Sequence, residues 1–321
     1  MTSPCAVPAR RVGIDVGGTK AQGIVLDAEN RVIAQARRDT PRGHRSLGSL
    51  VERVAELAEE LQPDGPIGVG VPGLVGRDGV LHAAPNLDGV AHFEIRERLR
   101  ERLGRGVSTD SDGTNSALGE WQLGAGRGTT DMVLVTLGTG IGGGLVMGNR
   151  LQRGRNGFAG EIGHMVVDRD GPRCPCGRRG CWERYASGSG LARLAQEATA
   201  ARRLTSLVDE VGGDPADVRG EHVMAAARAG DPDALDVVEE FAGWVALGLS
   251  NLANTLDPQL FVLGGGLAEG ADLYLDPIRR RFPDFLYQPD LRPLPAIRFA
   301  EWGPLAGAVG AALLPGYDAA E

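Results

Sequence analysis

A group of cysteine and histidine residues carries the strongest chemical signal in this 321-residue sequence. The spacing is His164-x9-Cys174-x-Cys176-x4-Cys181. Three thiolates and one imidazole complete the tetrahedral ligand set of a structural zinc ion, which needs no open fourth position. Free thiols beside an unrelated histidine are the alternative, but cysteines this close together favour a metal over a disulfide framework. We therefore predict a structural Zn²⁺ that fixes the loop between Gly171 and Gly180.

Two acidic residues flank this zinc loop and are candidates for binding a polyhydroxyl compound. Glu161 lies just before His164, and Glu183 lies just after Cys181. Carboxylates held beside a rigid loop can accept hydrogen bonds from vicinal sugar hydroxyls. Surface salt bridges are the ordinary role of glutamate, but the metal loop favours a binding role here. His164 could bind zinc through one ring nitrogen and a sugar hydroxyl through the other.

Three glycine-rich turns, each after an apolar run, indicate a nucleotide site. In Asp15-Val-Gly-Gly-Thr-Lys20, backbone N–H groups can approach phosphate while the acid holds Mg²⁺, directly or through water. Gly138-Thr-Gly-Ile-Gly-Gly-Gly144 has neither the P-loop ending nor the dinucleotide spacing. Leu263-Gly-Gly-Gly-Leu267 would let a base or ribose lie against the main chain. Each turn alone is compatible with an ordinary hairpin, but three together predict ATP contacts at Asp15, Gly17, Gly18, Thr19, Lys20, Gly138, Thr139, Gly140, Gly264, Gly265 and Gly266.

A pair of aspartates provides candidates for a general base. Asp112 lies at the predicted start of a helix, where an aspartate also serves well as a plain N-cap. Asp110 lies two positions earlier and competes for either role. The local pattern leaves the choice between them open.

Alternating and helical apolar patterns predict the elements that position these residues. In the first part of the chain we expect strands at 11–14, 21–26, 32–37, 67–71 and 107–109, and helices at 46–62, 93–103 and about 112–121. Strands at 131–137, 145–147 and near 151 follow, then helices at 187–201, 216–229 and 232–256, strands at 260–263 and 296–299, and a small-residue helix at about 305–314. The order strand, glycine turn, strand, turn, strand occurs twice, which predicts a duplicated α/β unit.

Composition narrows the class of protein. The net charge of −8 argues against nucleic acid as a partner, because phosphate backbones select basic faces. No apolar run reaches the roughly 20 residues of a membrane span, and we find no signal-peptide pattern. Clustered cysteines suit a metal site in a reducing compartment. We expect a cytoplasmic enzyme that binds neither membrane nor nucleic acid.

The sequence resembles the ROK family of sugar kinases over roughly residues 11–314. The resemblance rests on segments that come in the family's order: Asp15-Val-Gly-Gly-Thr-Lys20, Gly70-Val-Pro-Gly73, Gly138-Thr-Gly-Ile-Gly-Gly-Gly144, Gly160-Glu-Ile-Gly-His164 and Cys174-Pro-Cys-Gly-Arg-Arg-Gly-Cys-Trp-Glu183. The last two form a highly specific combination.

The resemblance implies an α/β fold in two lobes, the actin-like (ribonuclease H-like) fold of ATPases and sugar kinases, with a cleft between the lobes. The N-terminal lobe would span 1–120 and be joined by a C-terminal helix at about 303–321. The C-terminal lobe would span 121–302. Relatives commonly form homodimers or homotetramers.

The resemblance also selects the catalytic residue. The family's catalytic segment reads Glu-Asn-Asp-Ala-Asn before Ala-Leu-Gly-Glu, so alignment on Ala117-Leu-Gly-Glu120 puts Asp112 at the catalytic base. Ser111 then replaces an asparagine that contacts the sugar near its 3- and 4-hydroxyls, and Thr114 replaces the later one. The implied sugar-binding residues are Gly73, Asn86, Ser111, Asp112, Glu161, His164 and Glu183.

The implied reaction is ATP- and Mg²⁺-dependent phosphorylation of the 6-hydroxyl of glucose or a glucose-like sugar. Because Ser111 lacks an amide, we also consider a 3-modified amino sugar such as kanosamine, with its amine near Asp110, a C7-cyclitol and N-acetylmannosamine. A sugar-sensing repressor of the same family is a poor alternative, since 14 residues precede Asp15, too few for a DNA-binding domain. A non-catalytic sugar-binding protein and a polyphosphate-dependent kinase are further alternatives.

Overall fold

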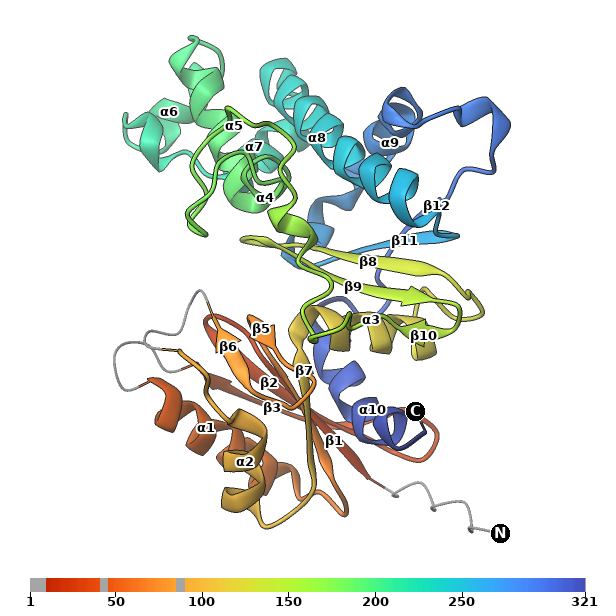
Figure 1. Ribbon diagram of the computed structural model, residues 1–321. Coiled ribbons are helices and arrows are strands. Elements are labelled where there is room, and N and C mark those ends of the chain that lie inside the picture. Colours follow the sequence, from red (N-terminus) through yellow and green to blue (C-terminus); the bar gives the residue numbers. More distant parts are fainter. Residues whose placement is uncertain (1–9, 41–45, 85–89, 321) are drawn as a thin grey trace. The chain divides into compact units, whose positions relative to one another are not determined.

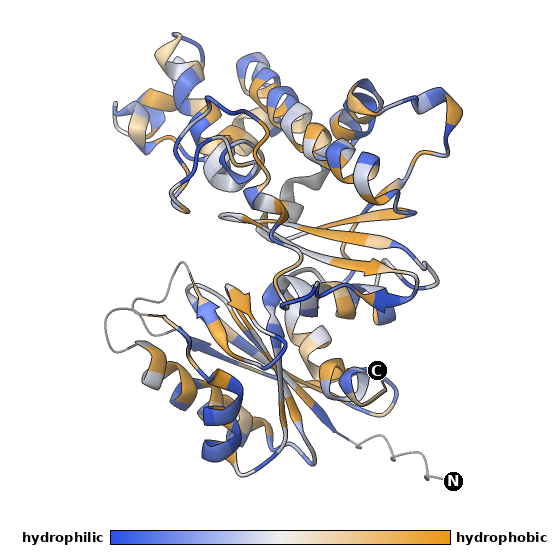
Figure 2. Ribbon diagram, in the orientation of Figure 1, coloured by the Kyte–Doolittle hydropathy of each residue, from blue (hydrophilic) through white to orange (hydrophobic). Residues whose placement is uncertain are grey.

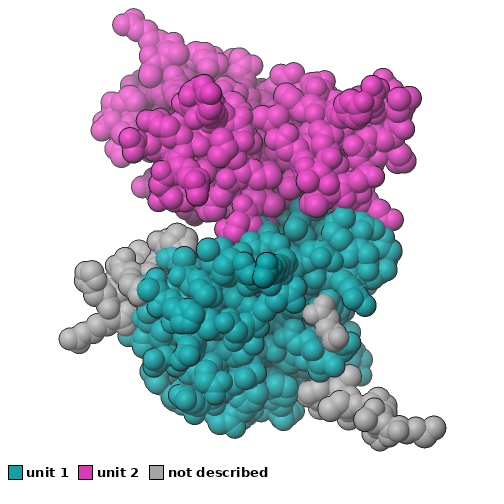
Figure 3. Space-filling view, viewed as in Figure 1, with its two compact units in different colours: residues 1–134, 144–160, 300–321 teal, residues 135–143, 161–299 magenta. Residues whose placement is uncertain are grey.

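The computed structural model describes residues 10–40, 46–84 and 90–320. The chain divides into two compact units (Figure 3). Unit 1 contains residues 1–134, 144–160 and 300–321, and unit 2 contains residues 135–143 and 161–299.

A five-stranded sheet forms the centre of unit 1, in the order β3-β2-β1-β4-β7 (Figure 1). Strands β1, β2 and β3 are antiparallel, whereas β4 and β7 run parallel to β1. The strands are β1 (Arg11–Val16), β2 (Lys20–Leu26), β3 (Val32–Asp39), β4 (Ile67–Val71) and β7 (Val107–Ser111). The helices of this unit are α1 (Ser46–Leu61), α2 (Ile95–Leu103), α3 (Asp112–Leu123) and α10 (Ala306–Ala320).

Alternation along β1 and β4 gives this sheet two different faces. Val12 and Ile14 belong to the core that α1 covers. Gly13 points the other way, where a side-chain carbon would lie 2.0 Å from the carbonyl oxygen of Ala308 in α10. Figure 1 shows α1 and α10 on opposite sides of the sheet. Because Asp15 shares the parity of Gly13, it lies on the face that α10 covers.

The second five-stranded sheet has the order β10-β9-β8-β11-β12. This order matches that of the first sheet strand for strand, which confirms the predicted duplication. Its strands are β8 (Met132–Leu137), β9 (Ile141–Met147), β10 (Arg150–Leu151), β11 (Leu260–Gly264) and β12 (Ala296–Phe299). Figure 2 shows hydrophobic residues concentrated along the strands.

Unit 2 contains six α-helices among its described residues: α4 (Glu183–Ala186), α5 (Gly188–Ala200), α6 (Thr205–Glu210), α7 (Gly220–Arg228), α8 (Pro232–Leu256) and α9 (Ala271–Arg281). The longest, α8, begins where the Asp231 carboxylate accepts a hydrogen bond from the N–H of Ala234 and Pro232 takes the first helical position. Among the described helices, none combines the length and apolarity that crossing a bilayer requires.

Several predicted boundaries were wrong. Strand β9 begins at Ile141, so Gly144 lies in a strand; a side-chain carbon there would lie 2.5 Å from the carbonyl oxygen of Gly113, which shows that α3 packs closely at this position. Helix α2 begins two residues later than predicted because Phe93 pairs with Leu81 in a β-bridge. The helix predicted at 216–229 is divided into a short 3₁₀ turn (Pro215–Asp217) and α7.

Some elements were missed altogether. The short strands β5 (Leu74–Val75) and β6 (Leu81–Ala83) are too brief for a pattern of alternation to emerge. Helices α6 and α9 were also missed, and α9 contains Pro277, which disfavours a helix interior.

Candidate active site

Parallel strands bring the acidic residues of unit 1 to one edge of its sheet. Asp15 of β1 pairs with Gly70 of β4, and Gly70 pairs with Asp110 of β7. Helix α3 begins at Asp112, directly after β7. A side-chain carbon on Gly70 would lie 2.8 Å from Oδ1 of Asp15 and 3.6 Å from Cα of Asp112. The structure therefore brings Asp15 and Asp112 together, as their predicted roles require.

Asp15 has an unusual environment for a carboxylate. Its Oδ1 is buried and has no hydrogen-bond partner among the described residues. The first turn of α10 lies against it, since a side-chain carbon on Gly307 would be 2.5 Å from the Asp15 carboxyl carbon. Burial, and then the negative charge of Asp112, raise the pKa of Asp15 to about 8. A bound cation would relieve both effects.

Asn115 is a candidate site residue that the sequence analysis missed. It is fully buried in α3, and neither its Oδ1 nor its Nδ2 has a partner in the part of the chain that is described. Its Nδ2 would lie 3.0 Å from a side-chain carbon on Gly70, the same point that Oδ1 of Asp15 approaches. Buried amide groups are normally hydrogen-bonded, so the Asn115 side chain is a candidate for binding a ligand or an ordered water. The available signal was an asparagine among the small and apolar residues of a buried helix.

Ser111, rather than either aspartate, is the N-cap of α3. Its Oγ accepts a hydrogen bond from the N–H of Thr114 at 3.1 Å and lies 2.8 Å from Oγ1 of Thr114. The reading of Asp112 as a plain N-cap is therefore wrong, because Asp112 occupies the first helical position. The Ser111 hydroxyl, predicted to contact the sugar, is already engaged within the helix.

Asp110 forms a buried ion pair. It is 5% exposed, and its Oδ2 lies 2.6 Å from Nε of Arg153, while its Oδ1 accepts from the N–H of Ser111 at 2.8 Å. Arg153 also contacts Asp318 at 2.8 Å. Burial raises the pKa of Asp110, and the Arg153 guanidinium opposes that rise. The buried ion pair gives Asp110 a structural role, and Asp112, which the family resemblance selects, is the candidate base.

The first glycine turn is held by main-chain contacts. The N–H of Gly17 donates to the carbonyl of Lys20 at 2.8 Å, and Thr40 donates through its hydroxyl to Gly17 and through its N–H to Thr19. The side chains of Thr19 and Lys20 are exposed. Gly18 completes this turn between β1 and β2.

The predicted metal ligands of unit 2 lie together. One ligand atom from each of His164, Cys174, Cys176 and Cys181 falls within 4.8 Å of all the others. Sγ of Cys176 lies 3.6 Å from Sγ of Cys181, and Sγ of Cys174 lies 3.9 Å from Nδ1 of His164. Two thiolates bound tetrahedrally at about 2.3 Å to one zinc ion lie about 3.8 Å apart. The donor set and its spacing fit zinc.

Buried packing of Trp182 holds the segment that carries the predicted metal ligand Cys181. Trp182, between Cys181 and Glu183, is fully buried and donates from Nε1 to the carbonyl of Trp244 in α8 at 2.8 Å. Burial, and then the thiols of Cys176 and Cys174, raise the pKa of Cys181 to about 12. Thiols this close together ionise together only with a cation among them.

The second glycine turn meets the predicted sugar-binding acids within unit 2. Oε2 of Glu183 accepts a hydrogen bond from the N–H of Ile141 at 2.9 Å. Nε2 of His164 lies 3.9 Å from Oε2 of Glu161, on the ring edge opposite the Nδ1 that faces Cys174. Burial raises the pKa of Glu161, His164 lowers it, and the nearby charge of Glu183 raises it further. Glu161, His164 and Glu183 therefore form one group.

The remaining predicted residues are distributed as follows. Gly138 accepts a hydrogen bond from the N–H of Gly188, at the start of α5, at 2.7 Å, and Thr139 is exposed beside it. Gly264 ends β11, and Gly265 adopts a positive φ of 87° against the main chain of Leu137, leaving Gly266 exposed. Gly73 also has a positive φ and abuts the carbonyl of Ala83. Asn86 lies outside the described residues.

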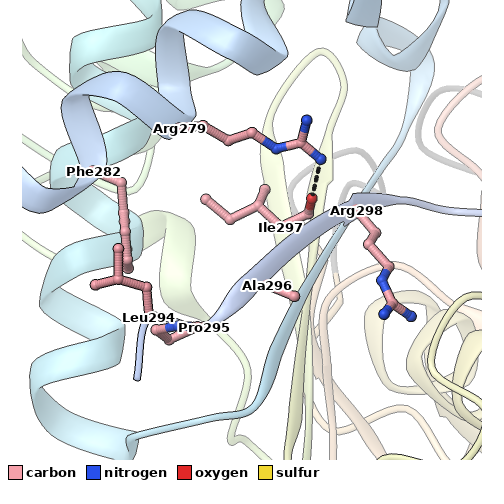
Figure 4. Close-up of a pocket in the computed structure, with 7 residues that line it drawn as sticks. All are labelled: Arg279, Phe282, Leu294, Pro295, Ala296, Ile297 and Arg298. Carbon is pink, nitrogen blue, oxygen red and sulfur yellow. Dashed lines mark hydrogen bonds between the residues drawn. The ribbon is translucent and has the colours of Figure 1, made fainter. Parts of the chain in front are cut away.

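One cavity of unit 2 contains none of these residues. It has a volume of about 280 Å³ and lies between α9 and β12 (Figure 4). Arg279 is already engaged there, because it donates to the carbonyl of Ile297 at 2.8 Å.

Comparison with known proteins identifies the family. Residues 11–316 match the ROK family. The chain belongs to the ROK family. It is 38% identical over 304 residues to a glucokinase of Streptomyces coelicolor, covering 94% of this chain and 96% of that protein. It is 35% identical over 320 residues to an N-acetyl-D-glucosamine kinase of Pectobacterium atrosepticum, covering 94% and 97%.

A solved structure supports the same assignment. The ROK family glucokinase of Streptomyces griseus in complex with glucose and AMPPNP superposes with a TM-score of 0.83 at 38% identity, covering 94% of this chain and 98% of that one. The ROK relationship confirms the predicted family and fold class. It also confirms the prediction that the chain is a sugar phosphotransferase.

Proposed function

We propose that this ROK sugar kinase transfers the γ-phosphoryl group of ATP to the primary 6-hydroxyl of glucose or a glucose-like sugar. The observation that carries the proposal is the convergence of Asp15, Asp112 and Asn115 at one sheet edge, beside the first glycine turn. Buried polar atoms that lack a hydrogen-bond partner in the described part of the chain favour a polar ligand at this edge.

Asp112 is the proposed general base. It accepts the proton of the attacking hydroxyl as the new oxygen–phosphorus bond forms, and the bond between the β- and γ-phosphates breaks to release ADP. Asp110 is unsuited to this role because Arg153 and the N–H of Ser111 engage both of its oxygens.

Asp15 is the residue that would hold Mg²⁺, directly or through water. Its Oδ1 has no hydrogen-bond partner among the described residues, and its pKa is raised; both observations fit a carboxylate that binds a cation. When bound, Mg²⁺ supplies charge neutralisation for the triphosphate. We propose that backbone groups of the glycine turns contact the nucleotide at Gly17–Gly18, Gly138–Gly140 and Gly264–Gly266.

The group of Glu161, His164 and Glu183 is proposed to hold sugar hydroxyls. Its position is maintained by the four metal ligands and by the N–H of Ile141. A Zn²⁺ ion bound by these residues would have a structural role, since four protein ligands would complete its coordination. Because the cytoplasm keeps thiols reduced, we propose that the enzyme is cytoplasmic. We also propose that it forms a homo-oligomer, as the family resemblance implies.

Ser111 favours a second candidate substrate, a sugar modified at C3 such as kanosamine. Its hydroxyl caps α3, so this position presents no amide to a 3- or 4-hydroxyl. Asp110 offers little to an amine, because its charge already pairs with Arg153. Glucose is therefore the first choice and a 3-amino sugar the second.

The test is a coupled ADP-release assay on glucose, mannose, N-acetylmannosamine, N-acetylglucosamine, kanosamine and a C7-cyclitol, with wild type and Ser111→Asn. We expect phosphorylation of at least one hexose, and a rise in kcat/KM for glucose in Ser111→Asn. A restored hydrogen bond to a hydroxyl is worth about 0.5–1.5 kcal/mol, or roughly 2- to 12-fold. Absence of ADP release with every sugar would refute the kinase assignment, whereas a kanosamine preference would select the second candidate.

A further inference from the structure

A polar cavity lies within unit 1, on a side of β7 that the proposed reaction does not use. Its volume is about 350 Å³. Four arginines and two aspartates line it, together with Ser108 and Thr109 of β7: Arg77, Arg96, Arg100, Arg153, Asp110 and Asp318. This size lies near the lower end of the range for small-molecule sites, about 300–1,000 Å³.

Positive charge exceeds negative charge in this cavity. Both aspartates already pair with one arginine, Arg153, at 2.6 and 2.8 Å. Three cationic side chains remain in a protein whose net charge is −8. The cavity is therefore a local concentration of positive charge that its own acids do not neutralise.

Arg96 is part of the wall. Its Nε donates to Oγ1 of Thr109 at 3.2 Å, Nη2 donates to the carbonyl of Thr109, and Nη1 donates to the carbonyl of Arg77. Burial, and then the neighbouring Arg100 cation, lower the pKa of Arg96. An anion in the cavity would offset that repulsion.

Arg77 and Arg100 differ from Arg96 in how they are held. Each uses Nε for a main-chain carbonyl, that of Gly154 at 2.8 Å and that of Val107 at 3.2 Å. Nη1 of Arg100 also forms an ion pair with the exposed Glu97, whose Oε2 lies 3.6 Å away. Both side chains are thus anchored at Nε, and an anion in the cavity would meet the terminal nitrogens of Arg77 and share those of Arg100 with the exposed Glu97.

We propose that this cavity binds a phosphate group, either inorganic phosphate or the phosphate of a sugar monophosphate. Guanidinium groups anchored at Nε present a planar fork of N–H donors, which matches the tetrahedral oxygens of a phosphate dianion. Ser108 adds a hydroxyl donor at the same wall. An apolar ligand is disfavoured because charged and hydroxyl side chains dominate the lining.

This site goes beyond the proposed kinase reaction and does not depend on it. The cavity shares Asp110 with the strand that leads to Ser111 and Asp112. Its occupant consequently lies beside the segment that carries the proposed base. Free phosphate and a phosphorylated sugar share the chemistry that the arginines recognise, and the experiment separates the two sources.

The experiment is calorimetric titration of the full chain with inorganic phosphate and, separately, with glucose 6-phosphate. Saturating glucose is present so that the sugar subsite of the kinase is filled. Wild type is compared with Arg77→Gln/Arg100→Gln and with Arg37→Gln/Arg53→Gln, a control that removes two charges of the same unit that do not line the cavity. We expect a dissociation constant of about 1 mM or tighter in wild type and in the control, and binding at least about 10-fold weaker in Arg77→Gln/Arg100→Gln.

Outcomes separate the sources and decide the proposal. Arginine-dependent binding of inorganic phosphate supports the site and shows that the phosphate group suffices. Arginine-dependent binding of glucose 6-phosphate alone supports the site and identifies a sugar phosphate. No binding in wild type, or equal affinity in all variants, overturns the proposal. If the double variant melts at a lower temperature than wild type, Arg100→Gln alone is used, and unchanged affinity there overturns the proposal equally.

Discussion

The main-chain N–H of Ile141 donates a hydrogen bond to Oε2 of Glu183 at 2.9 Å. This bond joins the second glycine turn, proposed to meet the nucleotide, to an acid proposed to hold the sugar. A side-chain carbon at Gly140 would lie 2.3 Å from the same Oε2, so the Glu183 side chain would have to shift to accommodate it. A substitution at Gly140 therefore acts on the proposed sugar-binding group by displacing Glu183 and leaves the residue types of that group unchanged.

Gly140→Ala is expected to displace the Glu183 carboxylate and raise KM for the sugar. We expect kcat/KM to fall by about 10-fold or more, equivalent to a lost hydrogen bond to a charged group. Gly243→Ala in α8 is the matched control, since a side-chain carbon at that position meets nothing within 4 Å. Equal kinetics for the two variants would show that the Gly140–Glu183 contact has no bearing on catalysis.

Asp112→Asn is expected to lower kcat by at least about 10²-fold, the range for loss of a general base. The melting temperature and zinc content should stay at wild-type values, because the amide can still occupy the first position of α3. Asp64→Asn, at an exposed turn of the same unit, controls for loss of one negative charge. Near-normal turnover in Asp112→Asn would refute the assignment of the base.

Cys181→Ser is expected to abolish bound zinc and to raise KM for the sugar, because the group of Glu161, His164 and Glu183 loses its support. Metal content is measured by elemental analysis of the purified protein, and stability by thermal melting. Cys5→Ser changes a cysteine outside the predicted ligand set and should retain metal. A protein that contains no zinc before mutation would contradict the metal prediction.

Asp15 should make the stability of the Mg²⁺-free protein depend on pH. Its pKa is raised to about 8 in the folded protein, so between about pH 4 and 8 the folded state keeps a proton that the unfolded chain has lost. The free energy of unfolding therefore falls as pH rises through this window, by up to about 1.4 kcal/mol per pH unit.

Urea unfolding at several pH values tests this dependence. Asp15→Asn removes the titrating group and should flatten the slope, whereas Asp39→Asn, exposed at the end of β3, should leave it unchanged. Addition of Mg²⁺ should also flatten the slope in wild type. Identical slopes for wild type and Asp15→Asn would contradict the raised pKa.

Features that depend on near neighbours in the chain could be predicted from the sequence. The metal ligands lie within one loop and the next turn, so their spacing alone indicates a tetrahedral site. The structure adds that Gly13 and Gly68, on neighbouring strands, both face α10, where carbonyl oxygens of Ala308 and Ala311 leave no room for a side chain. The duplicated strand order could be predicted for the same reason, since each copy carries its own glycine turn.

Long-range contacts account for what the sequence left open. Asp110 and Arg153 are 43 positions apart, and Ile141 and Glu183 are 42 positions apart. No local sequence pattern could therefore predict either contact. Asp110 and Asp112 are the same residue type in the sequence, and the buried ion pair of Asp110 with Arg153 is visible only in the tertiary structure. Asn115 became a candidate site residue because it is buried with no hydrogen-bond partner among the residues that the structure describes. Residue type and spacing specify which groups are available, but their protonation and their free hydrogen-bonding capacity depend on which distant segments pack against them.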